Sequence, residues 1–154
     1  MFHFGWDFAP AAEPREAVFD APLPPVEAAQ TMLVPEGFHV SLFAGEPEVR
    51  QPVGFCFDDR GRLWVAEAHN YPRHGTRPGD RILVFEDADG DGRFDTRTLF
   101  YDQLNYVTGI EVGFGGVWVV SPPYFYFLPD RDGDAQLDGS PEIVLDGLGN
   151  HANP

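Results

Sequence analysis

One stretch decides the fold class of this chain: Asp87-Ala-Asp89-Gly90-Asp91-Gly92-Arg93-Phe94-Asp95. Aspartates occupy positions 1, 3, 5 and 9 of this loop, and glycine occupies position 6. Runs rich in β-branched and aromatic residues flank it at 81–85 and 96–100, which predicts a hairpin of two strands around an acidic turn. A second loop with aspartates at the same four positions begins at Asp130. Two such loops indicate a repeated β unit with a metal ion in its turn.

The sequence around the acidic loops repeats as well. The segment 54–66, which contains Trp64, aligns with 109–120, which contains Trp118. The strand-like segments on either side of the loops also align, 82–85 with 124–128 and 99–102 with 143–146. A repeat of roughly 43–54 residues that holds four short strands and a tryptophan is typical of a β-propeller blade. The first unit is the longer one, because it contains the polar stretch 68–80.

We therefore predict an all-β fold, a partial β-propeller of about two four-stranded blades with a short N-terminal helix. The helix is expected at 25–32, where proline leads and alanines follow, and a further strand at 38–44. Residues 1–24 are expected to form an irregular leader, with a short edge strand as the alternative. Propellers usually close with 4–8 blades, so 25–154 is expected to be the N-terminal fragment of a propeller domain. A small two-sheet domain complete in itself is the alternative.

Composition and charge exclude several classes of partner. The 154 residues carry a net charge of −15, from 25 acidic side chains and 10 arginines. Nucleic acid is not expected to bind, because phosphate contacts need clustered cations. Cys56 is the only cysteine, which excludes an intrachain disulfide and a CxxCH haem attachment and favours an inert buried thiol. No apolar run reaches the roughly 18 residues of a membrane span, so this segment is not expected to insert directly into a membrane.

Both acidic loops fit calcium, a hard cation that takes 6–8 oxygen ligands. Carboxylates at positions 1, 3 and 5 converge as the backbone curls, while position 7 supplies a backbone carbonyl and position 9 a further carboxylate. The expected ligands are Asp87, Asp89, Asp91, the Arg93 carbonyl and Asp95 in the first loop, and Asp130, Asp132, Asp134, the Gln136 carbonyl and Asp138 in the second.

The loops differ from EF-hands and from each other. Position 12 is Thr98 or Pro141, where an EF-hand needs an acid, and the flanking segments are strand-like. The second loop has Ala135 where the first has Gly92. A positive φ at a non-glycine residue costs about 1–2 kcal/mol, so we expect the first loop to bind calcium more tightly. The alternative is a pair of solvated acidic turns, although four crowded carboxylates repel one another without a cation.

The polar stretch 68–80 is the best candidate for an active site. It joins two predicted strands, and ligands of propellers gather on loops at the mouth of the channel. His69 could act as a general base, and Arg73 could hold an anionic group. The alternative is a polar connecting loop with Tyr71-Pro72 packed on the blade. The chain contains no GxSxG, P-loop or dinucleotide-binding glycine pattern.

Five segments resemble the start of a bacterial family of membrane-bound dehydrogenase propellers, whose members are also described as haem-binding CxxCH proteins. These segments are Val34-Pro-Glu-Gly-Phe38, Phe57-Asp-Asp-Arg-Gly-Arg-Leu-Trp-Val-Ala-Glu67, 80–95, 107–118 and 129–134. The resemblance covers roughly residues 25–148, and its motifs are specific in combination.

The resemblance implies an exported multidomain protein of the periplasm or the cell exterior, with a propeller similar to that of glucose/sorbosone dehydrogenases. Those enzymes use pyrroloquinoline quinone, so the implied function is oxidation of a sugar or alcohol. Haem c is expected only in a downstream domain, because Cys56 is not part of a CxxCH motif. The catalytic histidine and arginine of those enzymes have no aligned motif here. The alternative is a non-catalytic, calcium-stabilised propeller that binds glycan or protein.

Overall fold

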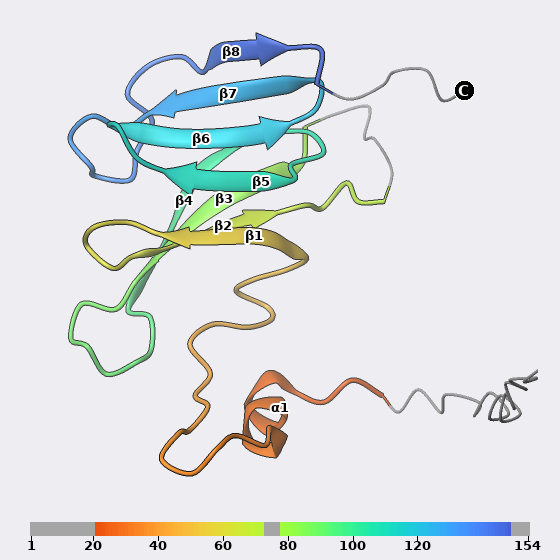
Figure 1. Cartoon of the computed structure of the whole chain (residues 1–154), viewed down its shortest axis with the longest axis vertical. Helices are drawn as coiled ribbons and strands as arrows, with labels where there is room; N and C mark the ends of the chain where they lie inside the picture. Colours follow the sequence, from red (N-terminus) through yellow and green to blue (C-terminus); the bar gives the residue numbers. More distant parts are fainter. Residues whose placement is uncertain (1–20, 73–77, 149–154) are drawn as a thin grey trace, which may run out of the picture.

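The computed structural model describes residues 21–72 and 78–148 (Figure 1). Within them one helix is followed by eight strands, which confirms the predicted all-β class and the predicted N-terminal helix. The elements are α1 (Pro25–Thr31), β1 (Pro52–Phe57), β2 (Leu63–Glu67), β3 (Asp80–Glu86), β4 (Thr96–Leu104), β5 (Gly109–Val112), β6 (Gly116–Ser121), β7 (Tyr124–Pro129) and β8 (Glu142–Asp146).

The strands form two four-stranded antiparallel sheets, each a simple meander. The first sheet has the order β1-β2-β3-β4 and the second has the order β5-β6-β7-β8 (Figure 1). The predicted repeat of two four-stranded units is therefore present, and neither sheet closes on itself. The unit lengths differ because residues 68–79 connect β2 to β3, whereas residues 122–123 connect β6 to β7.

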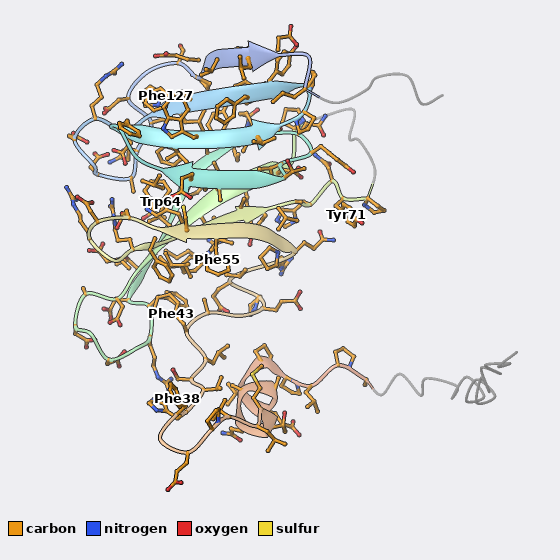
Figure 2. All side chains as sticks on the ribbon, in the orientation of Figure 1. Phe38, Phe43, Phe55, Trp64, Tyr71 and Phe127 are labelled. Carbon is orange, nitrogen blue, oxygen red and sulfur yellow. The ribbon has the colours of Figure 1, made fainter. Side chains whose placement is uncertain are left out.

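The hydrophobic core lies between the two sheets. Trp64 of β2 is fully buried there and meets Phe100 of β4 edge to face at 5.0 Å between ring centroids. The second sheet contributes Val117 and Val119 of β6 to the same core. Figure 2 shows Trp64 between the sheets, whereas Phe55 of β1 points to the far side of the first sheet. Side chains alternate across a strand, so each sheet turns one set of residues inward and the other outward.

The strand predicted at 38–44 is wrong. This segment pairs with no neighbouring strand, and Phe38 remains 72% exposed. Its later part instead lies on the outer face of the first sheet, where Phe43 packs with Phe85 and Phe94 in a second, smaller apolar cluster. Alternating apolar residues suggested a strand. A strand, however, must pair its backbone N–H and C=O groups with those of a neighbouring strand, and segment 38–44 has no such neighbour among the described residues.

Helix α1 begins as the sequence predicts. Pro24 occupies the N-cap position without a side-chain capping bond, and Pro25 occupies the first helical position, where a missing N–H costs no hydrogen bond. None of its residues is buried. No helix within the described ranges is long and apolar enough to cross a bilayer. Most of the leader predicted for 1–24 lies outside the described residues, and 21–24 adopt neither helix nor strand.

Candidate functional site

The two acidic loops lie at one end of the sheets, and His69 lies at the other. Because each sheet is an antiparallel meander, the β3–β4 and β7–β8 loops emerge on the same side as the β1–β2 turn. The β2–β3 connection that carries His69 emerges on the opposite side. We call these the acidic end and the His69 end. The two candidate sites predicted from the sequence are therefore separate.

In the first acidic loop, a carboxylate organises the backbone. Asp87 Oδ1 accepts a hydrogen bond from the Gly90 N–H at 2.8 Å, and Asp87 Oδ2 accepts one from the Gly92 N–H at 2.9 Å. Asp95 Oδ2 accepts the Ala88 N–H at 2.7 Å and closes the loop. Both oxygens of Asp87 therefore have protein donors, as expected for an aspartate that begins a turn.

The second loop has the same backbone turn. At position 4, Gly90 and Gly133 have φ values of 74° and 73°. At position 6, Gly92 has φ 85° and Ala135 has φ 63°. The alanine thus accepts the left-handed conformation whose cost the sequence analysis considered, and the residue is buried in the core between the sheets. The two loops are structural as well as sequence repeats.

Asp130 is the most unusual group of the second loop. The residue is only 7% exposed. Its Oδ2 accepts a long hydrogen bond of 3.3 Å from the Ala135 N–H, and its Oδ1 is buried without a partner among the described residues. Burial raises the pKa of this carboxyl, and the nearby Asp134 raises it further, although the backbone N–H of Ala135 opposes the shift. A buried polar atom without a partner destabilises the folded state by about 1–3 kcal/mol. A ligand bound at Asp130 Oδ1 would remove that cost.

Each loop brings three of its four predicted carboxylates together. Ligand oxygens within 4.8 Å of one another belong to Asp87, Asp89 and Asp91 in the first loop and to Asp130, Asp132 and Asp138 in the second. The predicted ligands Asp95 and Asp134 lie outside these groups. Their carboxylates accept backbone N–H bonds, Asp95 from Ala88 and Asp134 from Gln136, as carboxylates within the groups also do. The structure gives no contact that assigns the predicted carbonyls of Arg93 and Gln136 to either group.

Position 8 of each loop anchors it to an apolar cluster, which the sequence analysis missed. Phe94 packs against Phe85 with 5.1 Å between ring centroids, on the outer face of the first sheet. Leu137 packs against the core between the sheets. The sequence signal was an apolar side chain inside an otherwise polar loop. The second loop is therefore fixed to the sheet–sheet interface.

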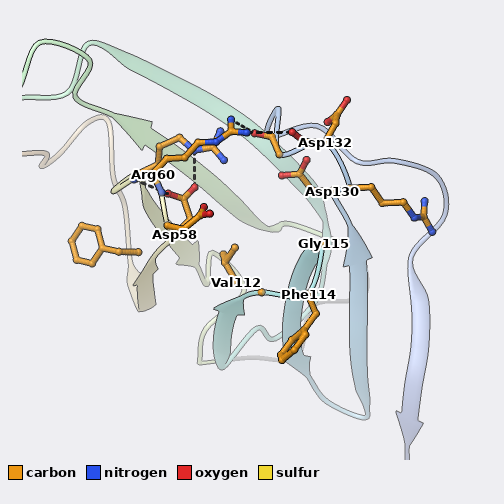
Figure 3. A pocket seen from close by; sticks show the side chains of 14 residues that line it. Asp58, Arg60, Val112, Phe114, Gly115, Asp130 and Asp132 are labelled. Atoms are coloured by element: carbon orange, nitrogen blue, oxygen red, sulfur yellow. Dashed lines mark hydrogen bonds and ion pairs between the residues drawn. The ribbon is translucent and has the colours of Figure 1, made fainter.

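A polar cavity of about 420 Å³ separates the second acidic loop from the β1–β2 turn of the first sheet (Figure 3). Asp58, Arg60, Phe114, Asp130 and Asp132 are among the residues that line it. Figure 3 shows Arg60 spanning from the turn that holds Asp58 to the loop that holds Asp132. Its guanidinium donates to the Gly133 carbonyl at 2.8 Å and to the Asp132 carbonyl at 3.3 Å.

Asp58 fixes the β1–β2 turn. Its Oδ2 accepts hydrogen bonds from Arg62 Nε at 2.6 Å and from the Trp64 indole N–H at 2.9 Å. Its Oδ1 accepts the backbone N–H groups of Arg60 and Arg62. Burial alone opposes ionisation of Asp58, but the hydrogen bonds from Trp64 and Arg62 outweigh it, so the pKa of this carboxyl lies below its ordinary value.

At the His69 end, the structure joins His69 to a carboxylate that the sequence analysis missed. The Glu67 side chain is fully buried, and its Oε2 contacts His69 Nε2 at 2.9 Å and accepts a hydrogen bond from Arg81 Nε. Its Oε1 accepts the Arg50 N–H at 2.6 Å. Burial opposes ionisation, but the bonds from Arg81 and His69 outweigh it and lower the pKa of Glu67.

A second buried carboxylate supports the same end. Asp80 is fully buried and accepts the Asn70 N–H and the Val107 N–H, both at 2.8 Å. It therefore ties the β2–β3 connection to the linker between the two sheets. The sequence signal that could have identified Glu67 and Asp80 as buried carboxylates was their position at the ends of apolar strands, β2 and β3. The other predicted residue of this end, Arg73, lies outside the described residues.

Comparison with known protein families gives one match. Residues 24–154 match the family described as Domain of unknown function (DUF7133). No curated protein and no solved structure matches the chain. The matched region begins just before α1 and includes both sheets and both acidic loops. Because the match covers most of the sequence, the chain belongs to the family described as Domain of unknown function (DUF7133).

Proposed function

We propose that this chain forms a calcium-stabilised pair of blades of a β-propeller. The observation that carries the calcium assignment is Asp130 Oδ1, a buried carboxylate oxygen with no partner among the described residues, within a group of three aspartates. A bound cation satisfies that oxygen and offsets the mutual repulsion of the group. Carboxylate oxygens suit hard cations, and calcium accepts irregular shells of 6–8 oxygens, whereas magnesium demands a small octahedral shell.

In this proposal Asp130, Asp132 and Asp138 hold calcium in the second loop, and Asp87, Asp89 and Asp91 hold it in the first. Asp95, Asp134 and the carbonyls of Arg93 and Gln136 complete the shells only if the loops adjust on binding. The higher affinity expected for the first loop from its glycine remains a prediction. The unpaired oxygen of Asp130 gives the second loop independent support that the first loop lacks.

The faces of the two sheets support the propeller. Trp64 lies opposite Val84 in the first sheet, and both residues face the second sheet. Trp118 lies opposite Phe127 in the second sheet, on the face that points away from the first, because the adjacent Val117 points inward. In the proposed propeller, a third sheet packed in the same way would cover Trp118 as the second sheet covers Trp64. Repeated packing of this kind is how propeller blades follow one another.

A second candidate function is the dehydrogenase that the family resemblance implies, with a sugar or alcohol as substrate. The observation that favours it is the contact between His69 and the buried, ionised Glu67. If His69 donates through Nε2, its Nδ1 is the nitrogen left to accept a proton from a substrate hydroxyl. The imidazole is 29% exposed, so a small molecule can reach it. The non-catalytic alternative, a propeller that binds glycan or protein, needs no such pair.

The quinone fits the described residues poorly. Pyrroloquinoline quinone carries three carboxylates, which require several cationic side chains or a metal ion. Near His69 the described residues offer Arg81, whose Nε is already bonded to Glu67, and Arg50, whose backbone N–H bonds the same carboxylate. We therefore derive no step through the quinone or through a haem of a downstream domain. Export to the periplasm or cell exterior remains part of the proposal, because the family resemblance implies it.

Calorimetric titration with calcium tests the proposed function. We expect heat from binding at the acidic loops, a higher melting temperature in calcium and a lower one after EDTA treatment. The Asp130→Asn variant should lose one of two sites. Asp59→Asn is the matched control, because it removes one exposed charge of the same cavity without touching the aspartate group. Unchanged melting with calcium and with EDTA would show that both loops are only turns.

A further inference from the structure

We propose that calcium in the second acidic loop clasps the two sheets together, and that Arg60 is the positioning residue of this clasp. The inference rests on the proposed calcium site and adds its structural consequence. The loop belongs to the second sheet, whereas Arg60 belongs to the β1–β2 turn of the first. Calcium binding and docking of the two sheets are then coupled equilibria, so each strengthens the other.

Arg60 holds the backbone at Asp132, one of the three proposed calcium ligands of the second loop. Its guanidinium donates to the carbonyl oxygens of Asp132 and Gly133, at positions 3 and 4 of the loop. A Cβ on Gly133 would lie 2.9 Å from Arg60 Nη2, so the guanidinium occupies the space beside that glycine. Two donors on a planar group fix the direction of both carbonyls. The backbone that Arg60 holds is thus the segment that carries the Asp132 side chain, one of whose carboxylate oxygens lies within 4.8 Å of an oxygen of Asp130.

The other end of Arg60 is fixed to the core. Its own N–H donates to Asp58 Oδ1 at 3.0 Å, and Asp58 Oδ2 accepts the indole N–H of the fully buried Trp64. The Arg62 guanidinium also bonds Asp58 and lies 5.6 Å from the centre of the Trp64 ring. The turn therefore moves with the first sheet and not independently of it.

The second loop is held just as firmly by its own sheet. The Asp130 N–H donates to the Gly115 carbonyl at 2.9 Å, and the Asp138 N–H donates to the Pro129 carbonyl at 2.8 Å. Ala135 is buried in the core between the sheets. The second loop, which contains Asp130, is thus bonded to its own sheet through Gly115 and Pro129 and to the first sheet through Arg60. Linkage is reciprocal. The free energy by which the Arg60 contact strengthens calcium binding equals the free energy by which bound calcium strengthens the docking of the sheets through that contact.

The first loop provides an internal comparison. A Cβ on Gly90, the counterpart of Gly133, would meet no atom within 4 Å, so no guanidinium occupies that place among the described residues. The charge of Arg60 acts in the opposite sense from its hydrogen bonds, since a cation near the site repels calcium. Removal of Arg60 should weaken calcium binding if positioning dominates and strengthen it if repulsion dominates.

The experiment measures calcium affinity of the second loop by calorimetry in an Asp89→Asn/Asp91→Asn background, which disables the first loop. We expect Arg60→Ala to weaken binding about tenfold, within the usual range of coupling between sites. Arg60→Lys should also weaken it, because an ammonium keeps the charge but cannot span two carbonyls. Arg97→Ala is the control, since Arg97 also donates to a backbone carbonyl, that of Glu48, far from the second loop.

The rise in melting temperature caused by calcium is a second readout, and it distinguishes a calcium-coupled role of Arg60 from a purely structural one. The clasp predicts that the rise in melting temperature caused by calcium shrinks in Arg60→Ala, whereas a structural role lowers both melting temperatures equally and leaves the rise unchanged. Unchanged or tighter calcium binding in Arg60→Ala overturns the inference while leaving the proposed function intact. Absence of calcium binding in the background variant itself overturns the proposed function.

Discussion

The substitution Asp130→Asn should have opposite effects on stability without and with calcium. In the calcium-free protein, Asp130 Oδ1 is buried without a partner, and burial raises the pKa of the carboxyl. An ionised group in that position is a cost to the folded state. Asparagine has nearly the same shape and no charge, and its NH₂ group can donate to the neighbouring aspartates. We therefore expect the calcium-free variant to be more stable than the wild type.

The size of the effect follows from the same geometry. A buried unsatisfied polar atom costs about 1–3 kcal/mol, so the calcium-free variant should gain about 1 kcal/mol or more at pH 7. The gain should depend on pH. Because the folded-state pKa of Asp130 is raised, its penalty is present above that pKa and disappears as the pH falls toward the ordinary value of 3.8. With calcium at 100 times its dissociation constant, the wild type gains about 2.7 kcal/mol that the variant lacks at this loop.

Urea denaturation of both proteins in EDTA and in calcium measures these free energies. The order of stability should reverse between the two conditions, with the variant ahead in EDTA and the wild type ahead in calcium. The exposed Asp59→Asn variant should show no reversal. If Asp130→Asn is less stable than the wild type in EDTA, then Asp130 Oδ1 is satisfied in the native protein and the reasoning is refuted.

Three further predictions concern other parts of the fold. Glu67→Gln should cost about 3 kcal/mol in urea denaturation at pH 7, because it leaves the Arg81 guanidinium beside a neutral group. Since the folded-state pKa of Glu67 is lowered, the difference in stability should shrink as the pH falls below the ordinary 4.5, and a difference that does not change with pH would contradict the ion pair. Gly92→Ala should lower the free energy of unfolding by about 1–2 kcal/mol, because Gly92 has φ 85°. Gly113→Ala should lower it little, since an added Cβ meets no atom within 4 Å at either glycine and Gly113 has no positive φ. Equal losses in urea denaturation would show that the backbone conformation of Gly92 is not the cause. Cys56 should react slowly with thiol reagents at pH 8 until the protein unfolds, since burial raises its pKa to about 11, and fast native labelling would show the thiol is accessible.

Local sequence patterns were sufficient for the strands and for the acidic turns. Alternating apolar residues and the repeat of Trp64 at Trp118 predicted two four-stranded units, because strand pairing in a meander involves consecutive segments. Dihedral requirements were also visible, as at Ala135, which takes the positive φ that its glycine counterpart suggested. The segment 38–44 shows the limit of such patterns, since its alternation was real but no partner strand was available.

Features that depend on burial could not be predicted from the sequence. Asp87 and Asp130 occupy the same position in their loops, yet Asp87 has donors at both oxygens and Asp130 has one oxygen without a partner among the described residues. The difference arises because the second loop packs against the interface between the sheets. The contact of Arg60 with that loop, and the pairing of Glu67 with His69 and Arg81, likewise depend on how distant segments meet.

The unpaired Oδ1 of Asp130 is proposed to bind calcium. A crystal structure determined in calcium tests this directly. We expect an ion about 2.3–2.6 Å from Asp130 Oδ1, with oxygens of Asp132 and Asp138 in the same shell. A structure at saturating calcium in which Asp130 Oδ1 binds a water molecule or a protein donor, with no ion beside it, would contradict the account.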